Sequence, residues 1–333
     1  KYNMNITIVK CFMEIFQSIW QPLVFLLLSM AILVWGADKF VNYSSLLSKK
    51  LGINELTIGL TVVAFGTSAP EIFVGISSVL NESESIAMGA IVGSNISNIA
   101  LIFGVACFGA SMKAKRTPSS QLIPVILSSG MLGIALYDLY VSFLESFIIL
   151  SILIYFMYIT FKNKSLDSLE EERDFIGTSN LLICVYLFIG LISLILGSRY
   201  AVINAEKIAY ILNISELIIG LTIVAIGTSL PELAATVAAV LKKKTDMVVG
   251  NVIGSNVLNI VLVVPIIGFF SNTQFEASIF NRDYIIMIFA TFIFLMIVKF
   301  QTSSRVSMSA IKAIGLLLLV GYGLYISLLA NLI

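Results

Sequence analysis

Two stretches of this sequence are close copies of each other: AFGTSAPE at residues 64–71 and AIGTSLPE at residues 225–232. A second pair follows them, with GAIVGSNISNI at residues 89–99 and GNVIGSNVLNI at residues 250–260. Both pairs are related by one offset, since residues 71 and 232 are 161 positions apart and so are 89 and 250. A single gapless offset over this length indicates an internal duplication, so we expect a chain built from two copies of one unit.

The composition is that of a membrane protein. Of the 333 residues, 59% are hydrophobic and 12% are charged, and the mean hydropathy is +1.02. Soluble domains average about 45–50% apolar and about 25% charged residues. Apolar stretches of about 20 residues, the length that lets an α-helix cross a bilayer core, recur along the chain. We predict ten spans, at residues 22–45, 56–80, 86–110, 120–138, 143–161, 180–203, 217–241, 247–270, 284–300 and 309–332.

Each copy contains five spans, an odd number, so the second copy should enter the membrane upside down. Basic residues support this, because Lys and Arg concentrate in cytoplasmic loops, and the basic run at residues 242–244 corresponds to a run without Lys or Arg at residues 81–83. Inverted repeats are typical of secondary transporters, whose substrate site lies near the membrane midplane. The predicted fold is an all-α polytopic membrane protein of ten transmembrane helices, arranged as two inverted five-helix repeats at residues 1–161 and 180–333 with a short cytoplasmic linker at residues 162–179.

Glu71 and Glu232, which end the two copies of the first motif, are predicted to lie inside the membrane. An ionisable side chain at that depth costs at least ~2.5–3.5 kcal/mol and normally has a partner or a function. Neither the span at residues 56–80 nor the span at residues 217–241 contains Lys or Arg. We therefore predict that the two carboxylates bind a cation.

A proline before each glutamate predicts a break in the helix. Pro70 and Pro231 lack the N–H groups that would bond the carbonyls of Gly66 and Gly227, and their rings crowd these carbonyls. Such free carbonyls are tolerated inside a membrane only where they face protein or a cavity. Hydroxyl groups add further oxygens to the expected site at each break, from Thr67, Ser68, Thr228 and Ser229.

The second motif of each copy supplies neutral oxygen atoms. Ser94 and Asn98 are four residues apart, as are Ser255 and Asn259, so each pair shares one face of a helix. Carboxylates, hydroxyls, amides and carbonyls, in a sequence without histidine, are typical of a site for a hard cation. Ca²⁺ accepts six to eight oxygens in flexible geometry, so this set suits Ca²⁺ better than Mg²⁺.

The predicted charge of the site favours exchange. Two carboxylates balance one Ca²⁺ or two Na⁺, so one site can hold these ions in turn. Left empty, two carboxylates ~5 Å apart would repel each other by roughly 3 kcal/mol at an effective dielectric constant of about 20. An empty carrier should therefore resist changing sides.

Other classes of protein fit the sequence less well. A cation channel usually lines one pore by oligomeric symmetry, whereas the symmetry here is internal to the chain. Paired carboxylates could perform acid–base catalysis, but no nucleophile or cofactor motif accompanies them, so we expect neither an enzyme nor a cofactor. The net charge of +1 gives no reason to expect nucleic acid as a partner. We expect a monomer that functions in the lipid bilayer.

The motifs GTSAPE with GSNISN and GTSLPE with GSNVLN resemble the two α-repeats of the sodium/calcium exchanger family, within the calcium/cation antiporters. The chain is similar to ten-helix, prokaryotic-type members, with α-repeats at about residues 54–105 and 215–266. The resemblance implies a secondary antiporter that exchanges Na⁺ for Ca²⁺ by alternating access. It implies that the first and sixth helices, at about residues 22–47 and 181–208, slide as a gate.

The resemblance also implies roles for single residues. Glu71 and Glu232 would bind Ca²⁺ with help from the carbonyls of Thr67 and Thr228. Na⁺ positions would be shared among Ala64, Thr67, Ser68, Ser94, Ala225, Thr228, Ser229 and Ser255.

The sequence departs from some relatives at Asn259, where an acidic residue in potassium-dependent members is associated with the use of K⁺. Because Asn98 and Asn259 are both neutral, we expect exchange that is independent of K⁺ and, with more than two Na⁺ per Ca²⁺, electrogenic. Proton-coupled relatives usually carry a GNAxE-type sequence in place of GTSxPE. A Ca²⁺/H⁺ exchanger on the same fold is therefore the alternative. The expected location is the plasma (cell inner) membrane.

Overall fold

The computed structural model describes residues 2–109, 117–163, 179–212, 214, 225–300 and 307–330, and only the backbone of residues 2–17, 225 and 300. The described chain is helical apart from short connections, which confirms the all-α prediction. The helical elements, with η for π-helical turns, are α1 Tyr2–Leu51, α2 Glu55–Ile58, η1 Gly59–Val63, α3 Ala64–Thr67, α4 Ala69–Leu80, α5 Glu84–Ser97, η2 Asn98–Phe103, α6 Gly104–Gly109, α7 Ser119–Tyr137, α8 Phe143–Lys162, α9 Asn180–Ile211, α11 Ala225–Thr228, α12 Leu230–Leu241, α13 Thr245–Phe270, η5 Ile279–Tyr284, α14 Ile285–Phe300 and α15 Met308–Leu329.

The helices agree with the predicted spans wherever the structure describes them. Within the described ranges, eight helices are long and apolar enough to cross a membrane, or nine if the bent pair Glu55–Thr67 and Ala69–Leu80 is one span. The predicted span at residues 217–241 is described only from residue 225, where α12 contributes 12 residues. Most of the predicted linker, residues 164–178, lies outside the described residues.

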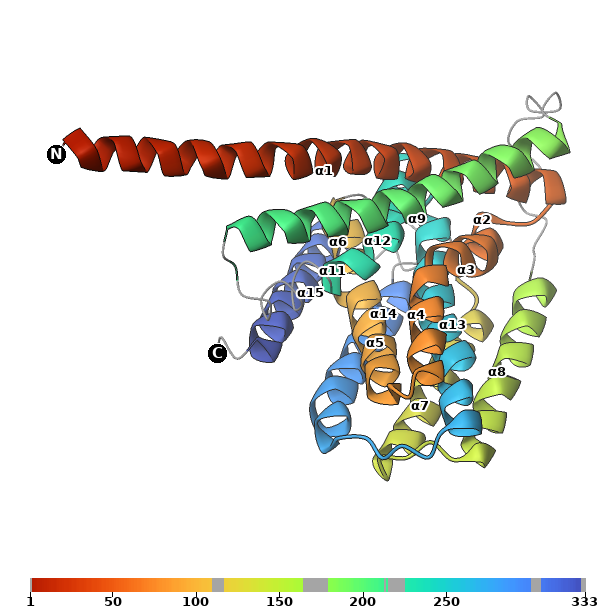
Figure 1. The fold of residues 1–333 in the computed structure, drawn as a ribbon. Helices are drawn as coiled ribbons and strands as arrows, with labels where there is room; N and C mark the ends of the chain where they lie inside the picture. Colours follow the sequence, from red (N-terminus) through yellow and green to blue (C-terminus); the bar gives the residue numbers. More distant parts are fainter. Residues whose placement is uncertain are drawn as a thin grey trace.

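The first helix is longer than the sequence suggested. The predicted span at residues 22–45 lies inside α1, which has 50 residues. No Gly or Pro interrupts residues 2–21, so nothing in the local sequence ends the helix before the apolar stretch begins. In Figure 1 the N-terminal part of α1 therefore projects beyond the rest of the bundle.

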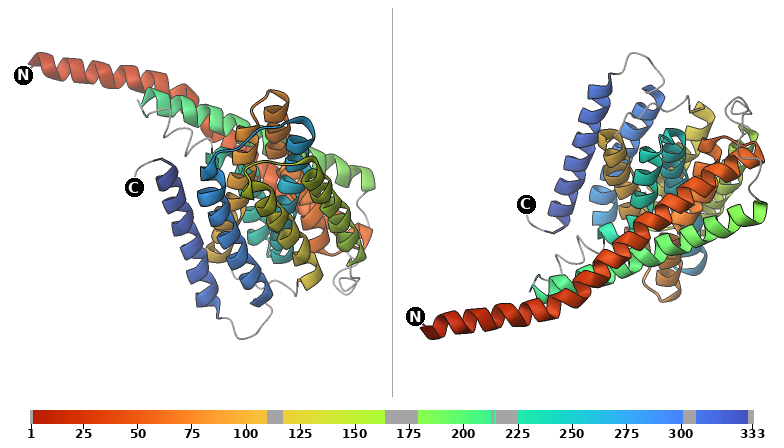
Figure 2. Two further views of the ribbon diagram at one scale, coloured as in Figure 1. Left: turned by 90° about the horizontal axis from the view of Figure 1, so that it is seen from below. Right: turned by 90° about the horizontal axis from the view of Figure 1, so that it is seen from above.

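Helices α1 and α9 lie side by side across one face of the bundle formed by the other helices (Figures 1 and 2). Their backbones meet at two glycines, because a methyl group added to Gly36 would lie 2.7 Å from the backbone nitrogen of Leu194. A methyl group added to Gly197 would likewise lie 2.7 Å from the backbone nitrogen of Leu33. The repeat offset turns the first contact into the second, so α1 and α9 meet through two equivalent contacts.

Two spans form the buried centre of the bundle. They are the continuous helix α5–η2–α6 and the helix α13. In each of them, 78% of the most apolar 18-residue stretch is buried. Helix α13 packs against η1, α3, α4 and α5. These two spans carry the second motif of each copy, so the neutral oxygens predicted from that motif lie in the interior.

Candidate functional site

The site begins at two helix breaks. Helix α3 ends at Thr67, Ser68 has φ −82° and ψ 0°, and α4 starts at Ala69 after a bend of 50°. The second copy repeats this geometry, because α11 ends at Thr228 and Ser229 has φ −91° and ψ 6° before α12. Both breaks fall where the prolines predicted them. At each break the proline has no N–H group to donate, so the carbonyl of Gly66 or Gly227 loses its helical hydrogen-bond donor.

Glu71 and Glu232 occupy the first turns of α4 and α12. Both side chains are buried, with exposed fractions of 7% and 1%, and they are close enough to each other for their charges to interact. Within the described part of the chain, their four carboxyl oxygens have neither a hydrogen-bond partner nor an ion pair with Lys or Arg. A buried pair of this kind needs an external cation to be stable as two carboxylates.

The structure gathers most of the other predicted site residues in the same interior. Thr228 is exposed, and the side chain of Ala225 is outside the described set, so these two are not placed in the buried cluster. The buried members are Ala64, Thr67, Ser68, Ser94, Asn98, Ser229, Ser255 and Asn259.

Hydrogen bonds join the two copies across the site. The Asn259 amide nitrogen donates to the Ser94 hydroxyl at 3.0 Å. The hydroxyls of Ser97 and Ser229 lie 2.7 Å apart. The Thr67 hydroxyl donates to the Asn251 side-chain oxygen at 3.3 Å. These bonds join the two second motifs to each other and the second motif of each copy to the helix break of the other copy.

Ser97 and Asn251 were missed by the sequence analysis. Their counterparts in the other copy are the apolar residues Leu258 and Ala90, so the duplicated motifs do not mark these two positions. Each of these residues is polar in one copy only and adjoins a motif residue, and this pattern could have identified them.

Several neutral oxygens remain without a protein partner among the described residues. They are the hydroxyls of Ser68 and Ser255, the amide of Asn98 and the amide oxygen of Asn259. Buried polar atoms are nearly always hydrogen-bonded, so such a cluster beside two carboxyls indicates a ligand. In the described ranges no group of three or more acidic, cysteine or histidine side chains could hold a metal ion. The available chemistry is therefore two carboxylates with neutral oxygens.

The second break also contacts the layer formed by α1 and α9. The Ser198 hydroxyl of α9 donates to the carbonyl of Gly227, one of the two carbonyls freed by proline, at 3.0 Å.

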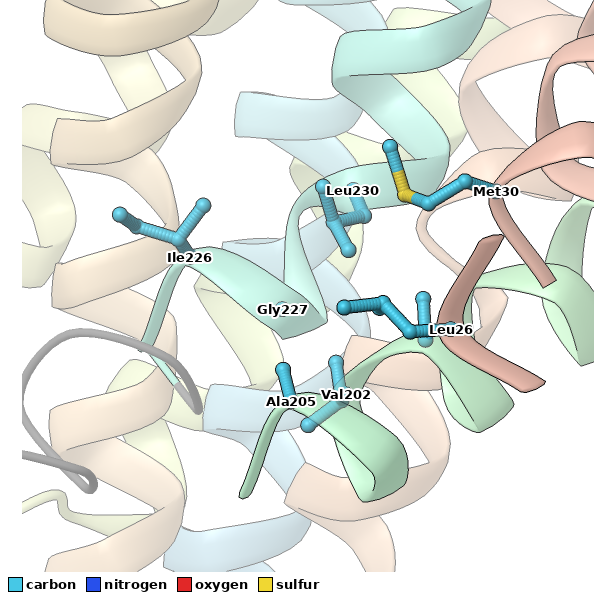
Figure 3. A pocket seen from close by; sticks show the side chains of 8 residues that line it. Leu26, Met30, Val202, Ala205, Ile226, Gly227 and Leu230 are labelled. Carbon is cyan, nitrogen blue, oxygen red and sulfur yellow. The ribbon is translucent and has the colours of Figure 1, made fainter. Parts of the chain in front are cut away.

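Beside Gly227 lies an apolar cavity of ≈ 280 Å³, lined by α1, α9 and the residues around the break (Figure 3). Side chains of the layer formed by α1 and α9 pack against both glycines, because a methyl group added to Gly66 would lie 2.9 Å from the ring of Phe40 and one added to Gly227 would meet the side chain of Val202. The counterpart of Phe40 is Ala201, a residue of the cavity wall.

Comparison with known proteins agrees with this geometry. The family model described as sodium/calcium exchanger protein matches residues 21–162 and 182–330. The chain belongs to this family. The exchanger is 33% identical over 314 residues to inner membrane protein YrbG of Escherichia coli, covering 91% of this chain and 95% of that relative. It is 31% identical over 292 residues to sodium/calcium exchanger MaX1 of Methanosarcina acetivorans, covering 74% of this chain and 82% of the relative.

A solved structure shows the same fold. The sodium/calcium exchanger from Methanococcus jannaschii matches this exchanger with a TM-score of 0.74 at 28% identity, over 92% of this chain and 97% of that one. Family membership, apolar spans and fold together make this chain an integral membrane protein of a family of ion exchangers, and its chemistry is transport.

Proposed function

We propose that this exchanger moves Ca²⁺ in one direction and Na⁺ in the other by alternating access. The observation that carries the proposal is the buried pair Glu71 and Glu232, without basic partners in the described part of the chain. Two carboxylates are neutralised equally by one Ca²⁺ or by two Na⁺. The names of sodium/calcium exchanger MaX1 and of the Methanococcus jannaschii sodium/calcium exchanger support the same ion pair.

The finer assignment follows from the ligand set. Ca²⁺ would be held by the two carboxylates with the carbonyls of Thr67 and Thr228, and Na⁺ by the surrounding hydroxyl and amide oxygens. Exchange would be electrogenic and independent of K⁺, because Asn98 and Asn259 add no third negative charge. We place the protein as a monomer in the cell inner membrane, as the name of the Escherichia coli relative suggests, with its two five-helix halves joined by a cytoplasmic linker.

Proteoliposomes test the coupling ion. An outward Na⁺ gradient should drive ⁴⁵Ca²⁺ uptake in purified exchanger at constant pH, and a pH gradient in Na⁺-free buffer should not. Uptake driven equally well by the pH gradient would reject Na⁺ coupling and favour the Ca²⁺/H⁺ alternative. Flux that needs no counter-ion would point to a channel.

A further inference from the structure

The two halves of the cation site differ at Ser97. Ser97 ends α5, and its counterpart under the repeat offset is Leu258 of α13. The Ser97 hydroxyl contacts the Ser229 hydroxyl at 2.7 Å, and both side chains are buried, at 2% and 1% exposed. The counterpart of Ser229 is Ser68, whose hydroxyl has no partner among the described residues. The second break therefore has a hydroxyl partner that the first break lacks.

The direction of this hydrogen bond follows from a second one. The Ser97 hydroxyl donates to the backbone carbonyl of Ser94 at 3.2 Å. A serine hydroxyl has a single hydrogen to donate and two lone pairs that accept. Either serine can donate in the contact between them, but only one arrangement makes both contacts hydrogen bonds: Ser97 donates to the Ser94 carbonyl, and Ser229 donates to Ser97. The result is a short relay, from Ser229 through Ser97 to the Ser94 carbonyl.

The relay determines what the Ser229 oxygen offers to an ion. With its hydrogen directed to Ser97, the Ser229 oxygen keeps both lone pairs for other contacts. A cation binds a hydroxyl through its lone pairs and is repelled by its hydrogen. Ser68 has no hydroxyl acceptor of this kind, since Leu258 carries no polar atom, and the acceptor that interacts with its side chain is the Glu232 carboxylate, a group of the site itself.

We propose that Ser97 is a positioning residue for Na⁺: it takes the hydroxyl hydrogen of Ser229 and so preorganises the Na⁺ position of the second half. The first half has no serine in the corresponding position, which is occupied by Leu258. The inference rests on the proposed Na⁺/Ca²⁺ exchange. In that function Ca²⁺ is held by carboxylates and backbone carbonyls, whereas the Ser229 hydroxyl serves only Na⁺. Loss of Ser97 should therefore affect Na⁺ and leave Ca²⁺ unchanged.

The test compares two reactions of the full chain in proteoliposomes. Na⁺-driven Ca²⁺ efflux gives the half-saturating Na⁺ concentration, and Ca²⁺/Ca²⁺ self-exchange in Na⁺-free buffer gives the half-saturating Ca²⁺ concentration. In Ser97→Ala we expect the half-saturating Na⁺ concentration to rise about two- to tenfold, the range of one lost hydrogen bond. The half-saturating Ca²⁺ concentration should stay at the wild-type value, which also shows that the variant is folded.

Two further variants separate positioning from packing. Ser97→Thr keeps the hydroxyl and should restore the Na⁺ dependence. Ser128→Ala removes another fully buried serine and should change neither constant. Among the described residues, the Ser128 hydroxyl bonds only the Val125 carbonyl of its own helix. An unchanged Na⁺ dependence in Ser97→Ala, or an equal rise for Ca²⁺, would overturn the positioning role. Wild-type protein that performs Ca²⁺ self-exchange without any response to Na⁺ would instead overturn the proposed function.

Discussion

Glu71 and Glu232 lie in the first turns of α4 and α12, where the free N–H groups of a helix N-terminus favour negative charge by about 0.3–1 kcal/mol. This is smaller than the repulsion of roughly 3 kcal/mol expected between two carboxylates ~5 Å apart. The helix ends therefore reduce the cost of the empty site without removing it. In the proposed function a bound cation supplies the rest, and this would link ion binding to the movement of the carrier.

The carboxylates give the most direct residue-level prediction. Glu71→Gln and Glu232→Gln keep the side-chain shape, and each removes half of the balancing charge. Each should abolish ⁴⁵Ca²⁺ uptake by proteoliposomes while the purified protein keeps a wild-type elution profile in detergent. Glu82→Gln is the matched control, because Glu82 is exposed in the turn after α4, and it should exchange normally. Near-normal exchange in either buried variant would show that the ion site lies elsewhere.

At the scale of helices, the breaks were predictable and the asymmetry between the copies was not. Pro70 and Pro231 act on their own helices, so the breaks at Ser68 and Ser229 could be read from the sequence. Ser97 and Ser198 act through partners 132 and 29 residues away, and no local pattern reveals such contacts. Two π-helical turns also leave no signal in apolar periodicity. The turn η1 precedes α3, the short helix that ends at the first break, and the turn η2 begins at Asn98. Such turns are frequent at functional sites.

The glycine contact between α1 and α9 predicts opposite effects of one substitution at two places. In Gly36→Ala the new methyl group would lie 2.7 Å from the Leu194 backbone nitrogen, so the helices must separate, at a cost of about 1–3 kcal/mol. In Gly321→Ala of α15 the methyl group has no described atom within 4 Å. There the higher helix propensity of Ala should dominate.

Thermal unfolding in detergent checks this pair of variants. The midpoint should fall for Gly36→Ala and stay equal or rise for Gly321→Ala. Equal midpoints for the two variants would mean that α1 and α9 separate at no cost, contrary to the close packing of their backbones.

For the whole molecule, the two copies of the repeated sequence share a plan but differ in the side chains around the helix breaks. Phe40 packs against Gly66, whereas its smaller counterpart Ala201 lines the cavity near Gly227, between the second break and the layer of α1 and α9. Two identical halves would open the central site equally to both sides of the membrane. An alternating-access carrier requires unequal halves, and the cavity provides apolar space into which side chains of α1 or α9 can move.

The balance of charge over a full cycle gives the last prediction. The carboxyl pair compensates two positive charges, and Asn98 and Asn259 add none. The hydroxyls of Ser68 and Ser255, without partners in the described part of the chain, offer neutral oxygens for further Na⁺. If more than two Na⁺ exchange for one Ca²⁺, each cycle moves net positive charge in the direction of Na⁺. The rate should then depend on voltage, by up to ~2.3 kcal/mol per elementary charge per 100 mV.

The measurement is Na⁺-driven ⁴⁵Ca²⁺ uptake into liposomes whose membrane potential is clamped with ionophores. An inside-positive potential should accelerate uptake, because Na⁺ leaves while Ca²⁺ enters, and an inside-negative potential should slow it. With the potential clamped by a proton ionophore at fixed pH, replacing K⁺ by choline should change nothing, since no third carboxylate is available to hold K⁺. A strict requirement for K⁺ would contradict the role given to Asn259. An uptake rate that does not change with the membrane potential would mean that two Na⁺ balance each Ca²⁺ and that the neutral oxygens hold no additional ion.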